Sequence, residues 1–285
     1  MSSSTELSNR QKKVKAVIES NTVELTMDVF KIFQKKIFSE TGISLDSSKI
    51  SLVQSRLYKR LLFYKVKSFS EYLRIIQIDH KEKMEMLNLI TTNETYFFRE
   101  ESHYNFLVKH LQQHHSKFRV WSAAASVGAE AYTIAMVLDE HLQRDSWEIV
   151  ASDINTEVIK KGRTGMYPLN WMDKIPEKYR KKHCMIGKGK YEKQFLVSRT
   201  LSKSISFLQN NLMKANPDLG KFDIIFLRNV LIYFNDATKT HVINNLMRNL
   251  KPKGYLIISL TESLQNLNLK DLEQVSTSIY QKQGY

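Results

Sequence analysis

The sequence has few of the features that mark secreted, membrane-spanning or disulfide-bonded proteins. Its 285 residues include one cysteine, Cys184, so a disulfide within the chain is excluded and a reducing compartment is favoured. No run of about 18 apolar residues is present, so we expect no membrane-spanning helix. Residues 1–20 are polar and lack the apolar stretch of a secretory signal, and we expect them to form a flexible tail.

Two common nucleotide-binding signatures and a metal motif are also missing. There is no GxGxxG turn, and the P-loop lysine is absent, which argues against ATP hydrolysis. His110 and His114 are four residues apart, but no glutamate of a metalloprotease helix lies between them and no third ligand is evident. We therefore expect no metal.

What the sequence does have is positive charge. Lysine and arginine number 43 against 29 acidic residues, a formal net charge of +14. Hydrophobic residues make up 42%, which is typical of a folded globular protein, and the length suggests about two domains. A charge of this sign fits nucleic acid or any other acidic partner, so its location along the chain must decide.

The first part of the chain has a helical pattern. Val29, Ile32, Phe33 and Ile37 recur at the spacing of one helix face. Further helices are predicted at residues 46–64, 71–76 and 82–90, the first of these capped by Asp46 or Ser47. We therefore expect residues 21–90 to form a small all-helical domain.

Residues 91–285 have the alternation of an α/β domain. Strands are predicted at 118–124, 147–153, 204–208, 222–227 and 254–260, with helices at 129–141, 154–161 and 237–250. This order favours a mostly parallel sheet covered on both faces, with one further edge strand at 275–281. Residues 167–203 break the alternation, and we interpret them as an inserted subdomain with a strand at 195–197.

One polar segment lies in the joint between the two predicted domains, and two more stand at the carboxyl ends of strands, where ligands bind in such sheets. They are Thr91–Glu100 (TTNETYFFRE), the turn Ser122–Glu130, and Asp223–Phe234, which carries Arg228 and Asn229 after a hydrophobic strand. Asp153 ends the predicted strand 147–153, which follows the Ser122–Glu130 turn and its helix. A carboxylate there can accept hydrogen bonds from both ribose hydroxyls of an adenosine cofactor. Each segment taken alone could equally be an ordinary linker or turn.

Together these segments resemble the CheR-type chemotaxis receptor methyltransferases. The runs TTNETYFFRE, WSAAASVGAEAYTIAM, ASDINTEVIKKGRTGMY, FDIIFLRNVLIYF and LKPKGYLIISLTESL follow the family's order and spacing. The resemblance implies a Rossmann-like S-adenosylmethionine (SAM)-dependent methyltransferase domain with a small inserted β-subdomain, after a helical N-terminal domain. It implies transfer of the methyl group to glutamate side chains of chemotaxis receptors for sensory adaptation, with S-adenosylhomocysteine as the product and no metal.

The resemblance also implies roles for individual residues. Glu130 would hold the ammonium end of SAM, Asp153 the ribose, and Asn211 and Leu212 the adenine. The residues implied to bind the cofactor are Asn93, Thr95, Arg99, Glu130, Asp153, Asn211, Leu212, Asn229 and Val230, and those tied to catalysis are Arg99 and Tyr233. The turn AAASVGAEAYT departs from the family's usual GCSTGEEPYS, and we expect residues 259–263, which also depart, to be peripheral.

Two basic regions suggest where an acidic protein would dock. Six basic and no acidic residues lie between Lys49 and Lys67, and on a helix Lys49, Arg56 and Arg60 share one face. In the family this helix docks on receptor helices, so the docking residues would be Lys49, Arg56, Lys59 and Arg60. Residues 171–203 carry ten basic and three acidic residues, and the inserted β-subdomain could bind the receptor C-terminal tail as an added strand.

These considerations lead to one expected setting and leave two alternatives. We expect a cytoplasmic monomer that is recruited to membrane receptor arrays, without membrane insertion or nucleic-acid binding. One alternative is a SAM-dependent nucleic-acid methyltransferase, although neither an Asn/Asp-Pro-Pro-Tyr motif nor paired catalytic cysteines are present. The other is a degenerate member that binds SAM or receptors without activity, which the altered turn would favour.

Overall fold

The computed structural model describes residues 23–111 and 117–284, and the predicted tail at residues 1–20 lies outside them. The described chain divides into two compact units. The smaller unit comprises the described residues up to Ser39 together with residues 45–90, and the larger comprises residues 40–44 and those from Thr91 onward. Each unit has its own core and is described by itself.

Every regular element among the described residues of the smaller unit is a helix. Its elements are α2 (Met27–Thr41, whose last two residues belong to the larger unit), the short 3-10 helix η1 (Ser47–Lys49), α3 (Ile50–Tyr64), α4 (Phe69–Ile78) and α5 (His80–Ile90). Asp46 caps η1 by accepting from the Ser48 amide, as predicted, and Ser68 caps α4 in the same way.

The predicted buried face of the first helix needs one correction. Phe30, Phe33 and Ile37 are fully buried, whereas Ile32 is 49% exposed. The spacing of positions 30, 33 and 37 places these three side chains on one stripe of α2, and position 32 falls outside it.

The larger unit contains a seven-stranded sheet in the order β6-β2-β1-β7-β8-β10-β9. Its strands are β1 (Phe118–Ser122), β2 (Trp147–Asp153), β6 (Ile205–Gln209), β7 (Phe222–Leu227), β8 (Leu250–Ile258), β9 (Leu272–Ser276) and β10 (Ile279–Lys282). Neighbours from β6 through β8 pair in parallel, and β10 pairs antiparallel with β8 and β9. The α/β fold predicted from the alternation is confirmed.

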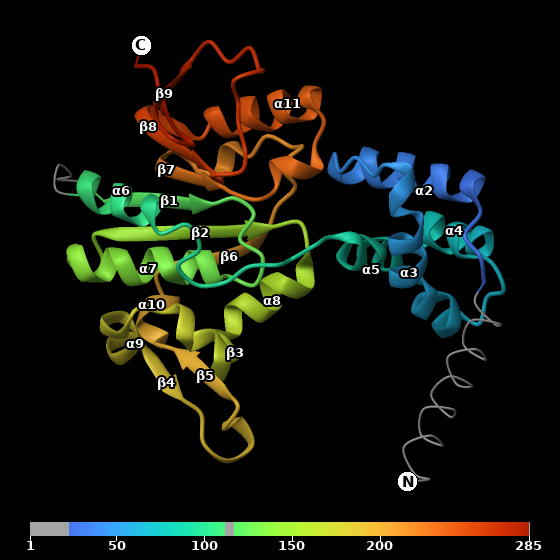
Figure 1. Cartoon of the computed structure of the whole chain (residues 1–285), viewed down its shortest axis with the longest axis horizontal. Coiled ribbons are helices and arrows are strands. Elements are labelled where there is room, and N and C mark those ends of the chain that lie inside the picture. Colours follow the sequence, from blue (N-terminus) through green and yellow to red (C-terminus); the bar gives the residue numbers. More distant parts are fainter. Residues whose placement is uncertain (1–22, 112–116, 285) are drawn as a thin grey trace, which may run out of the picture. The chain divides into compact units, whose positions relative to one another are not determined.

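Helices cover both faces of this sheet (Figure 1). They are α6 (Ser102–Leu111), α7 (Ala129–His141), α8 (Thr156–Thr164) and α11 (Asp236–Met247), with 3-10 turns η4 (Pro217–Leu219) and η5 (Leu231–Tyr233). Alternate strand residues enter two separate cores, so Val120 packs with α6 and α7 whereas Trp121 packs with α11. This period of two along the buried strands is why the sheet needs a helical layer on each side.

The C-terminal segment differs from the single edge strand that we predicted. Residues 275–281 span parts of two strands, β9 and β10, and β10 lies between β9 and β8. The chain turns between them at Ser278, which has a left-handed backbone (φ 57°). The sequence pattern misses this turn because it contains no glycine, proline or asparagine.

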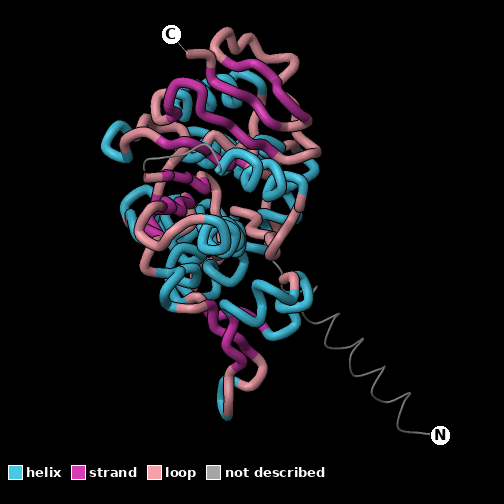
Figure 2. Tube along the Cα trace, turned by 90° about the vertical axis from the view of Figure 1, so that its left-hand side faces the viewer, coloured by secondary structure: helices cyan, strands magenta, loops and turns pink. Residues whose placement is uncertain are grey.

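The inserted subdomain has a three-stranded antiparallel sheet in the order β3-β5-β4. Its elements are β3 (Met166–Pro168), η2 (Leu169–Lys174), α9 (Glu177–His183), β4 (Cys184–Ile186), η3 (Gly189–Tyr191), β5 (Gln194–Val197) and α10 (Arg199–Ser202). The β4–β5 hairpin extends away from the larger sheet in both views (Figures 1 and 2). The predicted strand at 195–197 is confirmed as part of β5.

Candidate functional site

The sheet topology indicates where a ligand would bind. From β1 the chain proceeds outward to β2 and β6, and it then returns to β7 on the other side of β1. The carboxyl ends of β1 and β7 therefore form the topological switch point, the usual ligand crevice of open α/β sheets. The polar segments predicted from the sequence follow β1, β2 and β7 at this edge.

Asp153 lies at the carboxyl end of β2 and is nearly enclosed. Its carboxylate accepts hydrogen bonds from the backbone amides of Ser126 (2.8 Å) and Asn155 (3.0 Å). Burial raises the pKa of Asp153 above its ordinary value. The next residue but one, Asn155, caps α8, so the carboxylate and the helix start are held together.

Glu130 stands in the first turn of α7, close to the end of β1. The Ser122 hydroxyl donates to Glu130 Oε1 (2.6 Å), and Arg228 Nη1 donates to Oε2 (2.8 Å). The positive end of the helix dipole favours a carboxylate at this position. Glu130 is therefore held in a defined orientation by groups from both sides of the switch point.

Arg228, to which sequence analysis assigned no role, is the centre of a buried cluster. Its side chain is 2% exposed, and it contacts Glu130, Glu100 (3.1 Å), the Tyr104 hydroxyl (3.1 Å) and the backbone oxygen of Arg99 (2.6 Å). Burial opposes the charge of Arg228, but the charges around it outweigh that cost, and its pKa is raised. The available signal in the sequence was the run FLRN, in which the arginine follows directly after a buried strand.

Glu100 was also missed, although it belongs to the TTNETYFFRE run. Its carboxylate accepts from the Ser259 hydroxyl (2.7 Å) and the Leu260 amide (3.0 Å), besides its contact with Arg228. Burial would raise the pKa of Glu100, but these donors outweigh burial and lower it. Glu100 thus ties the 91–100 segment to the end of β8.

The rest of that segment crosses the turns after β1 and β2. The Ser126 hydroxyl donates to the Asn93 carbonyl (2.9 Å), and the side-chain amide of Asn155 donates to the Thr91 hydroxyl (2.8 Å). Thr95 and Arg99 are both partly buried, and the Arg99 guanidinium lies over the Tyr96 ring and donates to the Glu94 carbonyl (3.3 Å). Among the described residues, no carboxylate lies within ion-pair distance of Arg99, in contrast to Arg228.

Asn229 is positioned by the loop after β8. Its side-chain amide donates to Ser259 (2.8 Å), and its backbone amide donates to Glu262 (3.1 Å), which also accepts from Leu231 and Ser259. Our expectation that residues 259–263 are peripheral is therefore wrong. A buried carboxylate that accepts several backbone amides can fix an irregular loop, and here it fixes the loop that begins with Asn229 and Val230.

The remaining predicted residues lie beside the 40–44 segment of the same unit. Asn211 donates to the Glu40 carbonyl (2.6 Å) and accepts from the Met213 amide, while Leu212 is buried. The Tyr233 carbonyl accepts from the Ser44 amide (2.8 Å), and its side chain is partly exposed. Both of these hydrogen bonds join the Asn211 side chain to backbone atoms of the protein itself.

Unusual backbone conformations accumulate at this edge. Phe98, Glu100, Ser126 and Asn229 all have positive φ values, between 49° and 59°. Such conformations cost about 1–3 kcal/mol each in residues other than glycine and persist where the surroundings enforce them, often at functional sites. Gly128 also has positive φ (87°), and a Cβ there would lie 2.8 Å from the Phe207 ring, so this glycine is required by packing.

The chemistry of these residues fits SAM. Two of the roughly four lone-pair positions of the Asp153 carboxylate accept backbone N–H groups, which leaves the others for ribose hydroxyls. Glu130 offers a carboxylate for an ammonium group. The cluster of Glu100, Glu130 and Arg228 holds two carboxylates to one guanidinium, a balance that suits a ligand with positive charge.

The predicted docking helix is α3, and its arginines have contacts within the smaller unit. Arg56 donates to the Ile90 carbonyl, and Arg60 pairs through two nitrogens with Glu82, whose side chain is 2% exposed. Lys49 and Lys59 are exposed. The docking role of all four residues stays a prediction, but Arg60 now also has a structural role.

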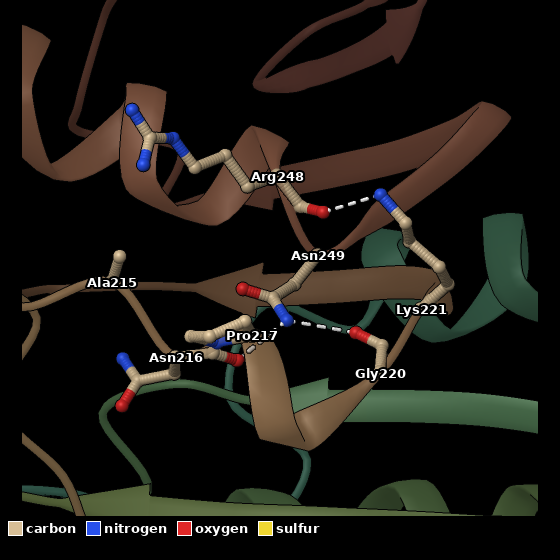
Figure 3. Close-up of a pocket in the computed structure, with 7 residues that line it drawn as sticks. All are labelled: Ala215, Asn216, Pro217, Gly220, Lys221, Arg248 and Asn249. Carbon is tan, nitrogen blue, oxygen red and sulfur yellow. Dashed lines mark hydrogen bonds between the residues drawn. The ribbon is translucent and has the colours of Figure 1, made fainter.

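The larger unit has two other features that could mark a site, a pocket and the free cysteine Cys184. A pocket at the opposite edge, before β7 and β8, is lined by Asn216, Lys221, Arg248 and Asn249, whose mutual hydrogen bonds involve backbone carbonyls (Figure 3). Burial raises the pKa of Cys184 to about 11, so its thiol is unreactive near neutral pH.

Residues 23–111 and 117–284 hold no group of three or more potential metal ligands, and His114 lies outside them. None of the helices in these ranges is long and apolar enough to cross a membrane.

Comparison with known proteins identifies the family. The family model "CheR methyltransferase, SAM binding domain" matches residues 93–280, and "CheR methyltransferase, all-alpha domain" matches residues 28–91. The chemotaxis protein methyltransferase of Salmonella typhimurium is 36% identical over 81% of this chain and 82% of its own length. Chemotaxis protein methyltransferase 2 of Pseudomonas aeruginosa is 36% identical (84% and 87%), and the Borreliella burgdorferi relative is 33% identical (91% and 96%). The chain therefore belongs to the CheR methyltransferase family.

Proposed function

We propose that this protein transfers the methyl group of SAM to glutamate side chains of chemotaxis receptors, forming glutamyl methyl esters. The observation that carries the proposal is the contrast between two arginines at one sheet edge. Arg228 is buried and paired with carboxylates, whereas Arg99 is partly exposed and has no carboxylate within ion-pair distance among the described residues. The two are joined by the hydrogen bond from Arg228 to the Arg99 carbonyl. Arg99 is thus the guanidinium available for a substrate carboxylate.

The reaction needs orientation more than acid–base chemistry. When bound, SAM supplies a methyl group already activated by its sulfonium. A glutamate with an ordinary pKa of about 4.3 is ionised near pH 7, so no general base is required. Arg99 would hold that carboxylate by two parallel hydrogen bonds, and such positioning can supply roughly 7–11 kcal/mol of a reaction barrier.

The other predicted residues would hold the cofactor. Asp153 accepts from the ribose, Glu130 accepts from the ammonium group, and Asn211 and Leu212 border the adenine. Asn93, Thr95, Asn229 and Val230 line the same edge, and the Tyr233 hydroxyl helps to orient the substrate carboxylate. The product is S-adenosylhomocysteine, which lacks the sulfonium charge.

The decisive experiment is transfer of labelled methyl from SAM to receptor-enriched membranes. We expect a base-labile product, as a glutamyl ester should be, and Arg99→Ala should lower kcat about 10²–10³-fold while SAM affinity changes only a few-fold. Arg248→Ala, at the opposite sheet edge, is the matched control and should transfer normally.

The alternatives give different results. A chain that binds SAM but transfers no methyl would support the inactive member, and a base-stable product on co-purified nucleic acid would redirect the substrate class. Normal transfer by Arg99→Ala would show that another group holds the carboxylate.

A further inference from the structure

We propose that Arg228 is a positioning residue of the methyl-transfer site, which with one guanidinium orients Glu130 on the cofactor side and the backbone of Arg99 on the substrate side. This role rests on the function proposed above. Arg228 is one residue before the predicted site residue Asn229, and its side chain is 2% exposed. It therefore acts through its neighbours and not by touching a substrate.

The contacts divide between the two nitrogens of the guanidinium. Nη1 donates to Glu130 Oε2 (2.8 Å) and to the Tyr104 hydroxyl (3.1 Å). Nη2 donates to the Arg99 carbonyl (2.6 Å) and lies 3.1 Å from Glu100 Oε2. A rigid planar fork can hold both sides at once, whereas a lysine ammonium is a single point of charge.

The backbone on either side of Arg99 explains why that carbonyl needs a donor. Phe98 and Glu100 both have left-handed backbones, with φ values of 55° and 59°. This strained stretch is held on one side by the Thr133 hydroxyl, which accepts from the Phe98 amide (3.1 Å), and on the other by Glu100. Arg228 donates the hydrogen bond to the Arg99 carbonyl between these two points. Without this bond the Arg99 side chain could rotate away from its present orientation.

Charge gives Arg228 a second, separable effect. Glu100 and Glu130 are both mostly buried, and Arg228 is the guanidinium that contacts both. The neighbouring His103 adds no charge at neutral pH, because burial and the nearby Arg228 lower its pKa to about 4. A substitution that keeps the charge but removes the fork should therefore separate the effect on Glu130 from the effect on Arg99.

The test compares Arg228→Lys, Arg228→Met and the control Arg119→Met in the full chain. Arg119 is a matched arginine at the amino end of β1, where it donates to Glu148 and to the Lys221 and Leu219 carbonyls. SAM affinity is measured by calorimetry, kcat and KM with receptor membranes, and stability by thermal unfolding.

We expect Arg228→Lys to bind SAM within about threefold of the unchanged chain while kcat falls about 10–100-fold, the usual cost of one hydrogen bond to a charged group. Arg228→Met should lose SAM affinity at least tenfold as well. Arg119→Met should lower the unfolding midpoint and leave both constants unchanged. If Arg228→Met does not fold, Arg228→Lys, which retains the charge, carries the test.

A double-mutant cycle shows whether Arg228 acts through Arg99. In an Arg99→Lys background, the kcat loss caused by Arg228→Lys should largely disappear. Additive losses, or an unchanged kcat in Arg228→Lys, would overturn the role. Failure of the proposed function is distinguishable, because the unchanged chain would then bind SAM and yield no base-labile product.

Discussion

Each unit of this protein pairs an arginine with buried or nearly buried glutamate, and the two clusters differ in their balance of charge. In the smaller unit Arg60 meets Glu82, and the same carboxylate also accepts from Tyr72 (2.6 Å) and Tyr64 (3.1 Å). Burial would raise the pKa of Glu82, but its partners outweigh burial and lower it. One positive charge meets one negative charge, and the carboxylate is well supplied with donors.

In the larger unit Arg228 meets two carboxylates, and its Nε has no hydrogen-bond partner among the described residues. The backbone beside it is left-handed at Phe98 and Glu100. Strained backbone of this kind is common at functional sites, and an excess of negative charge suits a positively charged ligand. We infer from this difference that the balanced cluster stabilises the fold of the smaller unit, whereas the unbalanced cluster serves the proposed cofactor site.

The largest expected effect comes from breaking the balanced cluster. Glu82→Ala removes the partner of Arg60 and the acceptor of two tyrosine hydroxyls, and we expect the smaller unit to lose about 3–5 kcal/mol of unfolding free energy. Hydrogen exchange of α3 and α5 measures this directly. Glu24→Ala, an exposed glutamate of the same unit, is the control and should change little. A weakened SAM affinity in Glu82→Ala would contradict a purely structural role.

The pH dependence of the unfolding free energy tests the surroundings of the unbalanced cluster, through the neighbouring His103. The Ser278 hydroxyl donates to the Thr277 carbonyl, so His103 Nε2 carries the proton that Ser278 accepts. With a folded pKa of about 4 against the ordinary 6.5, the unfolded chain binds a proton between these values that the folded chain does not. The unfolding free energy therefore falls as pH falls through this window, by up to about 3 kcal/mol.

His103→Gln keeps an N–H donor for Ser278 and removes the titration. Denaturant unfolding between pH 4 and 7 gives the unfolding free energy of the unchanged chain and of the variant. We expect this free energy to change more steeply with pH when His103 is present. Equal slopes would show that His103 is not held neutral in the folded state. The lowered pKa of Glu100 acts at lower pH and is common to both proteins.

The smallest expected effect concerns the surface of the smaller unit. Reversing the exposed Lys49 and Lys59 to glutamate should raise the KM for receptor several-fold, with a smaller effect at high salt and unchanged SAM affinity. Lys31 and Lys35, exposed on α2, provide the control with the same change of charge. Equal effects of both lysine pairs on KM would indicate that the overall positive charge attracts the receptor, without a specific docking face. Arg60 is unsuitable for this test because its reversal would break the pair with Glu82.

Much of the fold could be predicted because its signals are local. The boundaries predicted for α7, β2 and β7 match the structure, since each element is rich in apolar residues and is flanked by polar or turn-forming residues. The turn at Ser278 was missed because the left-handed conformation there is enforced by tertiary contacts and not by residue type. The buried face of α2 was assigned one position wrongly, because neighbouring apolar residues compete for the same stripe.

The sequence by itself determined the family, the order of elements and the segments that follow the strands, because motifs and hydrophobic periodicity are written along the chain. Only the tertiary structure decided what those segments do to one another. Arg228 reaches Glu130 across 98 positions and the Arg99 carbonyl across 129. Hydrogen bonds and charge pairs of that kind depend on distance in space. The pairing of β1 with β7 in the sheet sets that distance, and no spacing along the chain records it.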